Sequence, residues 1–329
     1  MWQLPEGGLP YDPKDAKKNK DITDPIVTLT GHQRRVGIVE WHPTAENVLL
    51  SAGFDYLLIV WNVSTGKALK EISCHTDTIY SLSFNWDGSL LATTCKDRVI
   101  RVLDPRTGVV VQQGQGHEGT KSFRAVWCGE MNKLFTTGFS KVSERQFGIW
   151  DPSDLSAPLK IEMIDTGSGV LFPYFDNDTQ LVYVAGKGDG NIRYYELDSA
   201  SPYAYFINEY KTATPQRGLG WLPKRGLTVG ECEVARCYKL TPKGSVEIVS
   251  FIVPRKSTLF QEDIFPPTRQ DQALLSAERW MAGENATPTK FSLKVPQALF
   301  FSFLLSAFIS RDPSLFDSLS LFSSLLSTT

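Results

Sequence analysis

The spacing of the histidines is the feature that most constrains what this chain can fold into. Only four His occur in 329 residues, and three of them, His32, His75 and His117, lie 43 and 42 residues apart. A period of roughly 40 to 45 residues is typical of small repeating units, each of which buries its apolar faces only by stacking on a neighbour. The spacing therefore predicts an array of like units.

Each unit contains short apolar runs bounded by turn residues. In the first unit these runs cover residues 36–41, 47–52 and 57–61, and runs of this length and composition are typical of β-strands. Two later units lack the His but keep the same rhythm, over residues 169–210 and 218–253. Because no helical period is sustained in this stretch, the sequence predicts an all-β chain of five units.

Polar residues recur at matching places in these units. In the first unit, Ser51, Asp55 and Trp61 follow His32. We expect Asp55 to accept a hydrogen bond from the His ring, the ring to meet the Ser hydroxyl, and that hydroxyl to meet the indole N–H. The later units supply the other members of this predicted structural polar network, which are His75, Thr93, Asp97, His117, Thr136, Trp150 and Asp189.

The second and third units vary this pattern. Leu103 replaces the Trp in the second, so its network should be shorter, and Glu144 follows a short insertion at the place of the turn acid in the third.

The units resemble the WD40 repeat, in which Gly-His opens a four-stranded blade of a β-propeller and a Trp-Asp or similar pair closes its third strand. A hydrolase triad also combines His, Ser and Asp, but several copies favour a scaffold, and we expect no catalytic residue.

Longer strings resemble those of one WD40 family, the coronins. They run in order over about residues 1 to 294, as residues 31–37, 41–45, 94–97, 137–140, 143–146, 185–189, 215–218, 223–227, 232–233, 253–257 and 260–263. The resemblance implies a seven-bladed propeller, a C-terminal extension packed on it, a variable linker and a coiled coil. It also implies a cytoplasmic protein of the actin cytoskeleton, with actin filaments and the actin-nucleating Arp complex as partners.

This chain departs from the coronin pattern at both ends. Residues 2–6 resemble the end of the family's second blade, so we expect residues 1–30 to be a remnant of a preceding blade, with the family's actin-binding first blade missing. Residues 31–254 then form five blades. Blades shaped for a seven-fold ring turn by about 51° each, whereas a closed five-fold ring needs about 72°, so an open arc is expected.

The C-terminal part divides in two. Residues 255–294 alternate apolar anchors with Pro and polar residues, and we expect them to pack on the propeller with one short helix over residues 273–281. Residues 295–329 contain nine Ser, eight Leu and six Phe and resemble neither the linker nor the coiled coil, so no coiled-coil oligomer is expected. The uncharged stretch 295–310 is shorter than the roughly 18 to 20 residues of a membrane span, and we expect a poorly ordered tail that associates through its apolar side chains.

The sequence shows no recognisable motif for nucleic-acid binding, phosphate binding, metal binding or catalysis. The formal net charge is −2, which argues against a nucleic-acid binder. Residues 186–190 contain Gly, Lys and Asp but lack the spacing of a phosphate-binding loop. The five Cys have no metal-ligand spacing and no signal peptide is recognisable. We expect no cofactor and no metal, a reducing compartment, and no enzymatic activity.

A set of basic residues recurs along the units, most of them in the loops before the first strands and between the second and third strands, which open on one face of a propeller. They are Arg34, Arg35, Lys96, Arg98, Lys121, Arg124, Lys141 and Lys187. Such a face could attract an acidic filament such as actin, although ordinary solvated loop charge is the favoured explanation. Two hypotheses remain: an actin-binding scaffold weakened by truncation, and a general WD40 adaptor or inactive fragment.

Overall fold

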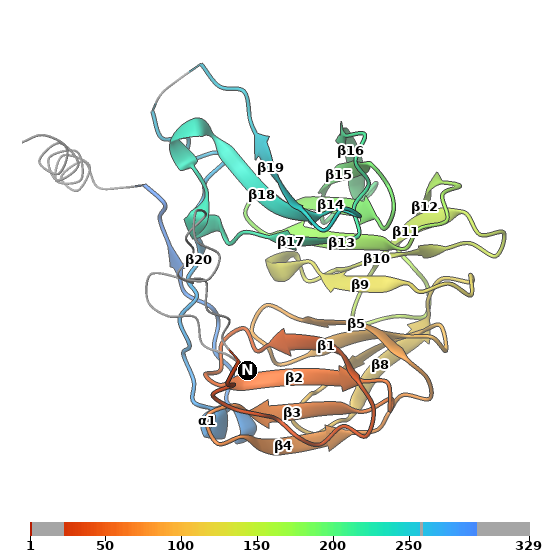
Figure 1. The fold of residues 1–329 in the computed structure, drawn as a ribbon, viewed down its shortest axis with the longest axis vertical. Coiled ribbons are helices and arrows are strands. Elements are labelled where there is room, and N and C mark those ends of the chain that lie inside the picture. Colours follow the sequence, from red (N-terminus) through yellow and green to blue (C-terminus); the bar gives the residue numbers. More distant parts are fainter. Residues whose placement is uncertain (2–22, 257–258, 295–329) are drawn as a thin grey trace, which may run out of the picture.

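The computed structural model describes Met1, residues 23–256 and residues 259–294. Within them, five antiparallel sheets follow one another in sequence order (Figure 1). The first four sheets have four strands each, with neighbouring strands in the sheet also consecutive in sequence, and the fifth has three. The prediction of an all-β propeller with five blades is confirmed.

The strands of the first two sheets are β1 (Val36–Trp41), β2 (Val48–Gly53), β3 (Leu58–Asn62), β4 (Lys67–Ile72), β5 (Ile79–Phe84), β6 (Leu91–Cys95), β7 (Val99–Leu103) and β8 (Val110–Gln115). Those of the third and fourth are β9 (Arg124–Trp127), β10 (Leu134–Phe139), β11 (Arg145–Trp150), β12 (Lys160–Asp165), β13 (Leu171–Asp176), β14 (Leu181–Gly186), β15 (Asn191–Leu197) and β16 (Ala204–Lys211). The fifth sheet contains β17 (Gly218–Trp221), β18 (Glu233–Leu240) and β19 (Val246–Ile252).

The core lies between neighbouring sheets. Strands β2 and β3 are buried at every position, because both faces of the first sheet are covered. Leu58 and Leu91 belong to a cluster between the first and second sheets, and Tyr183 and Cys237 to one between the fourth and fifth. No core cluster of the described residues joins the first sheet to the fifth, so the five blades form an arc.

Residues 259–294, which we call the strap, run from the fifth sheet along one side of the arc to the first (Figure 1). The strap carries a two-stranded sheet, β20 (Thr268–Arg269) with β21 (Lys290–Phe291), and one helix, α1 (Ala277–Met281). No helix in the described residues has the length and apolarity that a membrane span requires.

The strap is anchored at both ends of the arc. Near the fifth sheet, Arg225 forms an ion pair with Asp271. Near the first sheet, the backbone N–H groups of Leu274 and Leu275 donate to Thr44 O at 2.8 and 3.2 Å. This pairing keeps residues 274 and 275 extended, so the helix expected over residues 273–281 begins only at Ala277. The Ser276 side chain caps the helix by accepting from the backbone N–H of Arg279 at 3.3 Å.

Trp280 is the principal apolar anchor of the strap. Its side chain is completely buried in the cluster between the first two sheets, and its ring meets the His42 ring edge-on at a centroid distance of 4.6 Å. His42 in turn accepts from the backbone N–H of Ala45 at 2.8 Å through Nδ1. The indole therefore completes a core that the two sheets alone leave open.

We expect Trp280→Ala to lower the free energy of unfolding by about 3 to 5 kcal/mol, the usual cost of truncating a fully buried Trp. Urea unfolding followed by circular dichroism measures this change. The matched control is Gln272→Ala in the same strap, an exposed position where the change should stay within about 0.5 kcal/mol. Equal stability of the two variants would show that the strap does not contribute to the fold.

Candidate partner-binding face

The first blade contains a continuous chain of buried hydrogen bonds. Trp61 Nε1 donates to Ser51 Oγ at 2.8 Å, and Ser51 Oγ lies 2.7 Å from His32 Nε2. His32 Nδ1 lies 2.9 Å from Asp55 Oδ1. The structure thus brings together all four residues that the sequence placed in this network.

Gly53 is the residue that permits this arrangement. A Cβ at this position would lie 2.2 Å from Asp55 Oδ1 and 2.3 Å from His32 Nδ1, which is closer than real Cβ contacts allow. In the second blade the same place in the strand pairing is held by Cys95. The contact between His and the turn acid therefore cannot form there in the same way.

The structure contradicts the expected hydrogen bond between His75 and Asp97. His75 Nε2 does meet Thr93 Oγ1 at 2.8 Å, but no hydrogen bond joins His75 to Asp97 in the described residues. Asp97 instead accepts from Arg101 Nη2 at 2.6 Å and Nη1 at 3.2 Å. Burial alone would raise the pKa of Asp97, but these bonds hold it below its usual value.

The third blade differs from the expectation at its turn acid. His117 Nε2 lies 2.9 Å from Thr136 Oγ1, which also accepts from Trp150 Nε1 at 2.9 Å. The partner of His117 Nδ1 is Gln146 Nε2 at 2.8 Å, not Glu144. Glu144 instead receives a hydrogen bond from Ser140 Oγ at 3.2 Å, because the insertion carries it away from the ring.

In the fourth blade an arginine takes the place of the missing histidine. Asp189 accepts from Arg145 Nη1 at 2.6 Å, and Arg145 also donates to Asp165 Oδ1 at 2.5 Å and Oδ2 at 2.6 Å. A Cβ on Gly186 would lie 2.1 Å from Asp189 Oδ2 and 2.4 Å from Arg145 Nη1, so this glycine matches Gly53. Sequence reasoning missed Arg145 because it belongs to β11 of the preceding blade.

The turns between the second and third strands open on one face of the arc, together with the loops that lead into each first strand. We call this the loop face. The residue that follows Gly53 or its equivalent is Phe54, Lys96, Phe139 and Lys187 in blades one to four. The backbone N–H of Phe54, Lys96 and Lys187 donates to Arg35 O, Thr78 O and Val170 O at 3.0, 2.9 and 2.8 Å. These turns are therefore held in equivalent positions.

Where this position is aromatic, a cation from the adjoining loop lies over the ring. Arg35 Cζ is 4.0 Å from the centre of the Phe54 ring, and Lys121 Nζ is 4.6 Å from that of Phe139. In the other two blades the turn residue is itself a lysine. Each of the first four blades thus presents one exposed cation at a similar place, and we call Arg35, Lys96, Lys121 and Lys187 the cation row.

Three further predicted residues are exposed on the loop face, and one is not. Arg34, Arg98 and Lys141 are exposed, whereas Arg124 begins β9 and is half-buried, with Cζ 4.7 Å from the centre of the Phe172 ring. Burial lowers the pKa of Arg124. Of the eight predicted cations, only Lys96 forms an ion pair with a described residue, at 3.3 Å from Asp77 Oδ2.

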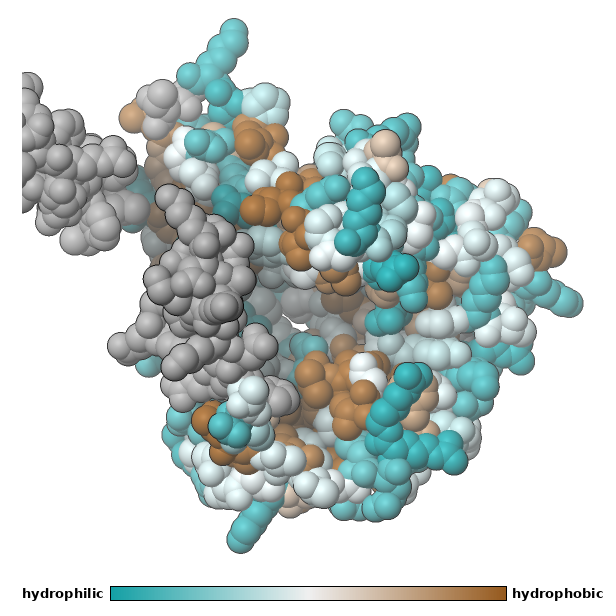
Figure 2. Space-filling view, viewed as in Figure 1, coloured by the Kyte–Doolittle hydropathy of each residue, from teal (hydrophilic) through white to brown (hydrophobic). Residues whose placement is uncertain are grey.

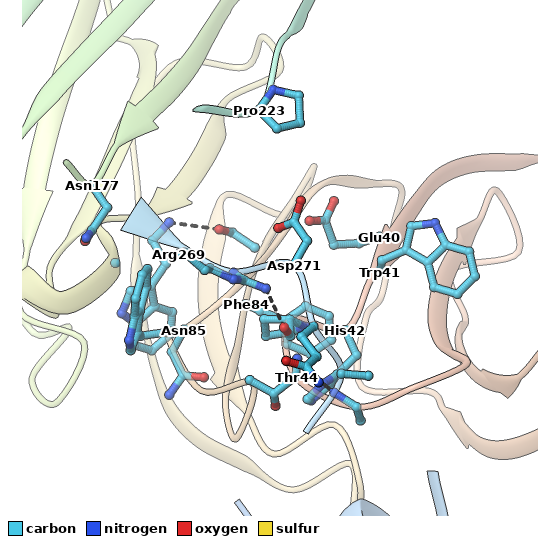
Figure 3. Close-up of a pocket in the computed structure, with 18 of the residues that line it drawn as sticks. Glu40, Trp41, His42, Thr44, Phe84, Asn85, Asn177, Pro223, Arg269 and Asp271 are labelled. Carbon is cyan, nitrogen blue, oxygen red and sulfur yellow. Dashed lines mark hydrogen bonds between the residues drawn. The ribbon is translucent and has the colours of Figure 1, made fainter. Parts of the chain in front are cut away.

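A cavity of about 830 Å³ lies at the opposite ends of the strands, between the blades and the strap (Figure 3). Figure 2 shows hydrophobic residues at the margin of the hollow between the first sheet and the sheets above it. Carboxylates of Glu40 and Asp271 point into the cavity beside Arg269. Arg269 also attaches the strap to the first blade, because it donates to Pro43 O.

Comparisons with known proteins agree with this architecture. The model described as "WD domain, G-beta repeat" matches residues 23–62 and 66–104, and the one described as "Type of WD40 repeat" matches residues 246–288.

Relatives and a solved structure cover most of the chain. Human Coronin-2A is 50% identical over 300 residues, which are 89% of this chain and 55% of that protein. Coronin-like protein crn1 of Schizosaccharomyces pombe is 45% identical over 88% of this chain and 47% of its own. The crystal structure of the WD40 domain from Toxoplasma gondii coronin has a TM-score of 0.81 and 33% identity, covering 89% of this chain and 74% of that one. The chain spans about half the length of the curated relatives it matches.

The buried histidines predict how stability depends on pH. Burial lowers the pKa of His117 to about 4, below the value of about 6.5 in an unfolded chain. The unfolded state therefore binds a proton before the folded state does, and stability is lost as pH falls from about 6.5 toward 4.

From pH 7 to pH 5 we expect His117 alone to remove about 2 kcal/mol from the free energy of unfolding. Urea unfolding at the two pH values measures the loss, and His117→Gln, which cannot titrate, should show a correspondingly smaller loss. A loss of the same size in wild type and variant would contradict this assignment.

Proposed function

The chain belongs to the coronin family, and from this membership together with the cation row we propose that it binds actin filaments as a non-enzymatic scaffold of the cytoplasmic actin cytoskeleton. The contact surface in this proposal is the loop face. The actin-nucleating Arp complex, which the family resemblance implies, is proposed as a second partner. The single observation that carries the proposal is the recurrence of an exposed cation at an equivalent place in each of the first four blades.

The cation row has the properties of a surface that receives an acidic partner. The four side chains come from four successive blades, so they follow the curve of the arc and do not form one compact cluster. Two of them, Arg35 and Lys121, lie over aromatic rings, which orients the cation and stabilises it by about 0.5 to 1 kcal/mol at an exposed site. Three of the four form no ion pair with a described residue, so their charge is available to a partner.

Electrostatics of this kind act mainly on the rate of association. The whole chain has a formal net charge of −2, so a local row of cations steers an acidic surface to one face while the rest of the molecule does not attract it. Exposed charges are screened beyond about 8 Å at physiological ionic strength. The proposal therefore requires binding that weakens as salt rises.

Co-sedimentation with actin filaments tests this proposal. We expect the double variant Lys96→Glu, Lys187→Glu to bind about tenfold more weakly than wild type, since each exposed pair contributes up to about 1 kcal/mol and about 1.4 kcal/mol corresponds to a factor of ten. Wild-type binding should also decrease between 50 and about 200 mM salt.

The matched control carries the same change of net charge away from the loop face. Lys67→Glu at the start of β4 and Arg279→Glu in α1 are both exposed and should leave binding unchanged. Equal weakening by both double variants would indicate a nonspecific charge effect. Tight binding that survives in the Lys96, Lys187 variant at high salt would exclude the loop face as the contact surface, and no binding of wild type at any salt would exclude the function.

A further inference from the structure

The hairpin between β10 and β11 is longer than the corresponding turn of the first blade. In the first blade the last bond between the second and third strands runs from Gly53 N to Leu57 O at 3.1 Å and leaves a short turn between them. Gly138 holds the place of Gly53 in the third blade and pairs with Gln146. The segment between these two partners, residues 139–145, is therefore longer, and we call it the blade-three hairpin.

The additional residues form two further pairs. Phe139 pairs with Arg145, and Ser140 N donates to Glu144 O at 2.8 Å. Two pairs at about 3.3 Å per residue lengthen the hairpin by about 7 Å. Its tip, residues 141–143, therefore stands further out on the loop face than the turn of the first blade, and Figure 1 shows the connection from β10 to β11 reaching beyond its neighbours.

Hydrogen bonds fix the shape of this tip. Ser143 N donates to Ser140 O at 2.9 Å, and Ser143 has a φ of 68°, the left-handed conformation that ends a three-residue hairpin turn. Ser140 Oγ donates to Glu144 Oε2 at 3.2 Å and accepts from Glu144 N at 3.1 Å. Because the tip is already ordered, placing it against a partner costs little conformational entropy.

The tip combines an apolar side chain with a cation. Val142 is 75% exposed, and the adjacent Lys141 is exposed and forms no ion pair with a described residue. A single exposed valine is common on protein surfaces, but this one lies at the end of a fixed projection among the cations of the loop face. The acid of the hairpin, Glu144, is bonded to Ser140 and does not neutralise the tip.

We propose that the tip of the blade-three hairpin inserts into an apolar recess, bordered by carboxylates, on the actin filament. Val142 is the apolar anchor, and Lys141 contacts the border of the recess. This inference rests on the proposed function and adds the residue that determines how long the complex lasts. The cation row acts mainly on the rate of association, whereas an apolar anchor buried at an interface acts mainly on the rate of dissociation.

The rates of binding to immobilised actin filaments, followed with fluorescently labelled chains, test this inference. We expect Val142→Ser to dissociate about tenfold faster than wild type, which corresponds to about 1.4 kcal/mol, and to associate at a rate within about twofold of wild type. The matched control is Val109→Ser, a 58% exposed valine in the turn between β7 and β8. That turn lies at the opposite ends of the strands, so both rates should remain those of wild type.

A second variant separates the apolar anchor from simple electrostatics. Val142→Lys adds a cation to the loop face, so a surface that binds by charge alone would bind the filament more tightly. An anchor that enters an apolar recess predicts the opposite, because the added ammonium group must lose its water. We expect this variant to dissociate at least tenfold faster than wild type, at low salt as well as at physiological salt.

Two results would overturn the inference and leave the proposed function intact. One is an unchanged dissociation rate in Val142→Ser while wild type binds filaments. The other is tighter binding by Val142→Lys. Absence of filament binding by wild type would instead overturn the proposed function and the inference together.

Discussion

A sheet of four short strands has two apolar faces and cannot cover both by itself, and the whole structure depends on meeting this constraint. Blades two to four meet it by stacking between neighbours, and the second strands of blades two and three, β6 and β10, are buried at every position. Among the residues that the structure describes, the two terminal blades each have one face without a neighbouring blade. On the first blade, Met1, Val27 and Leu29 pack against Leu49 and Trp61, whereas on the fifth the described residues leave an apolar row exposed.

The period of the sequence predicted the blades because stacking forces each unit to repeat the same strands and turns. It also predicted the first polar network in full, since Gly53 leaves room for the His ring beside Asp55. The network could not be extended by analogy to the second blade, because the thiol-bearing Cys95 stands where the glycine should. A single Cβ at this point changes which group the turn acid binds, and Arg101 replaces the histidine as the partner of Asp97.

Contacts between blades were harder to predict than contacts within them. Arg145 lies on the third blade and pairs both with Asp165 of the same blade and with Asp189 of the fourth. A search for a histidine within each unit does not detect this contact between blades. Arg124 illustrates the same limit. The sequence places most of the basic residues in loops, but Arg124 begins the innermost strand β9, where Phe172 of the next blade covers it.

The buried networks and the loop face are physically connected through the turn acids. Asp55 accepts from the backbone N–H of Gln33 at 2.8 Å and of Leu57 at 3.3 Å, so one carboxylate ties the loop before the first strand to the turn after the second. Arg35 and Phe54 lie within these two tied segments. Asp97 acts similarly in the second blade, where it accepts from Val99 N at 3.0 Å and from Thr76 Oγ1 at 3.2 Å.

The cations of the first two blades are thus held by groups that the fold requires for its own turns. The partner of the carboxylate can change from imidazole to guanidinium without moving the turn, because either group supplies the hydrogen-bond donors that the carboxylate needs. This explains how the blades diverge in their buried residues while Phe54 and Lys96 remain in equivalent positions on the loop face. A binding surface of this kind depends on the repeat for its geometry and on a few exposed side chains for its chemistry.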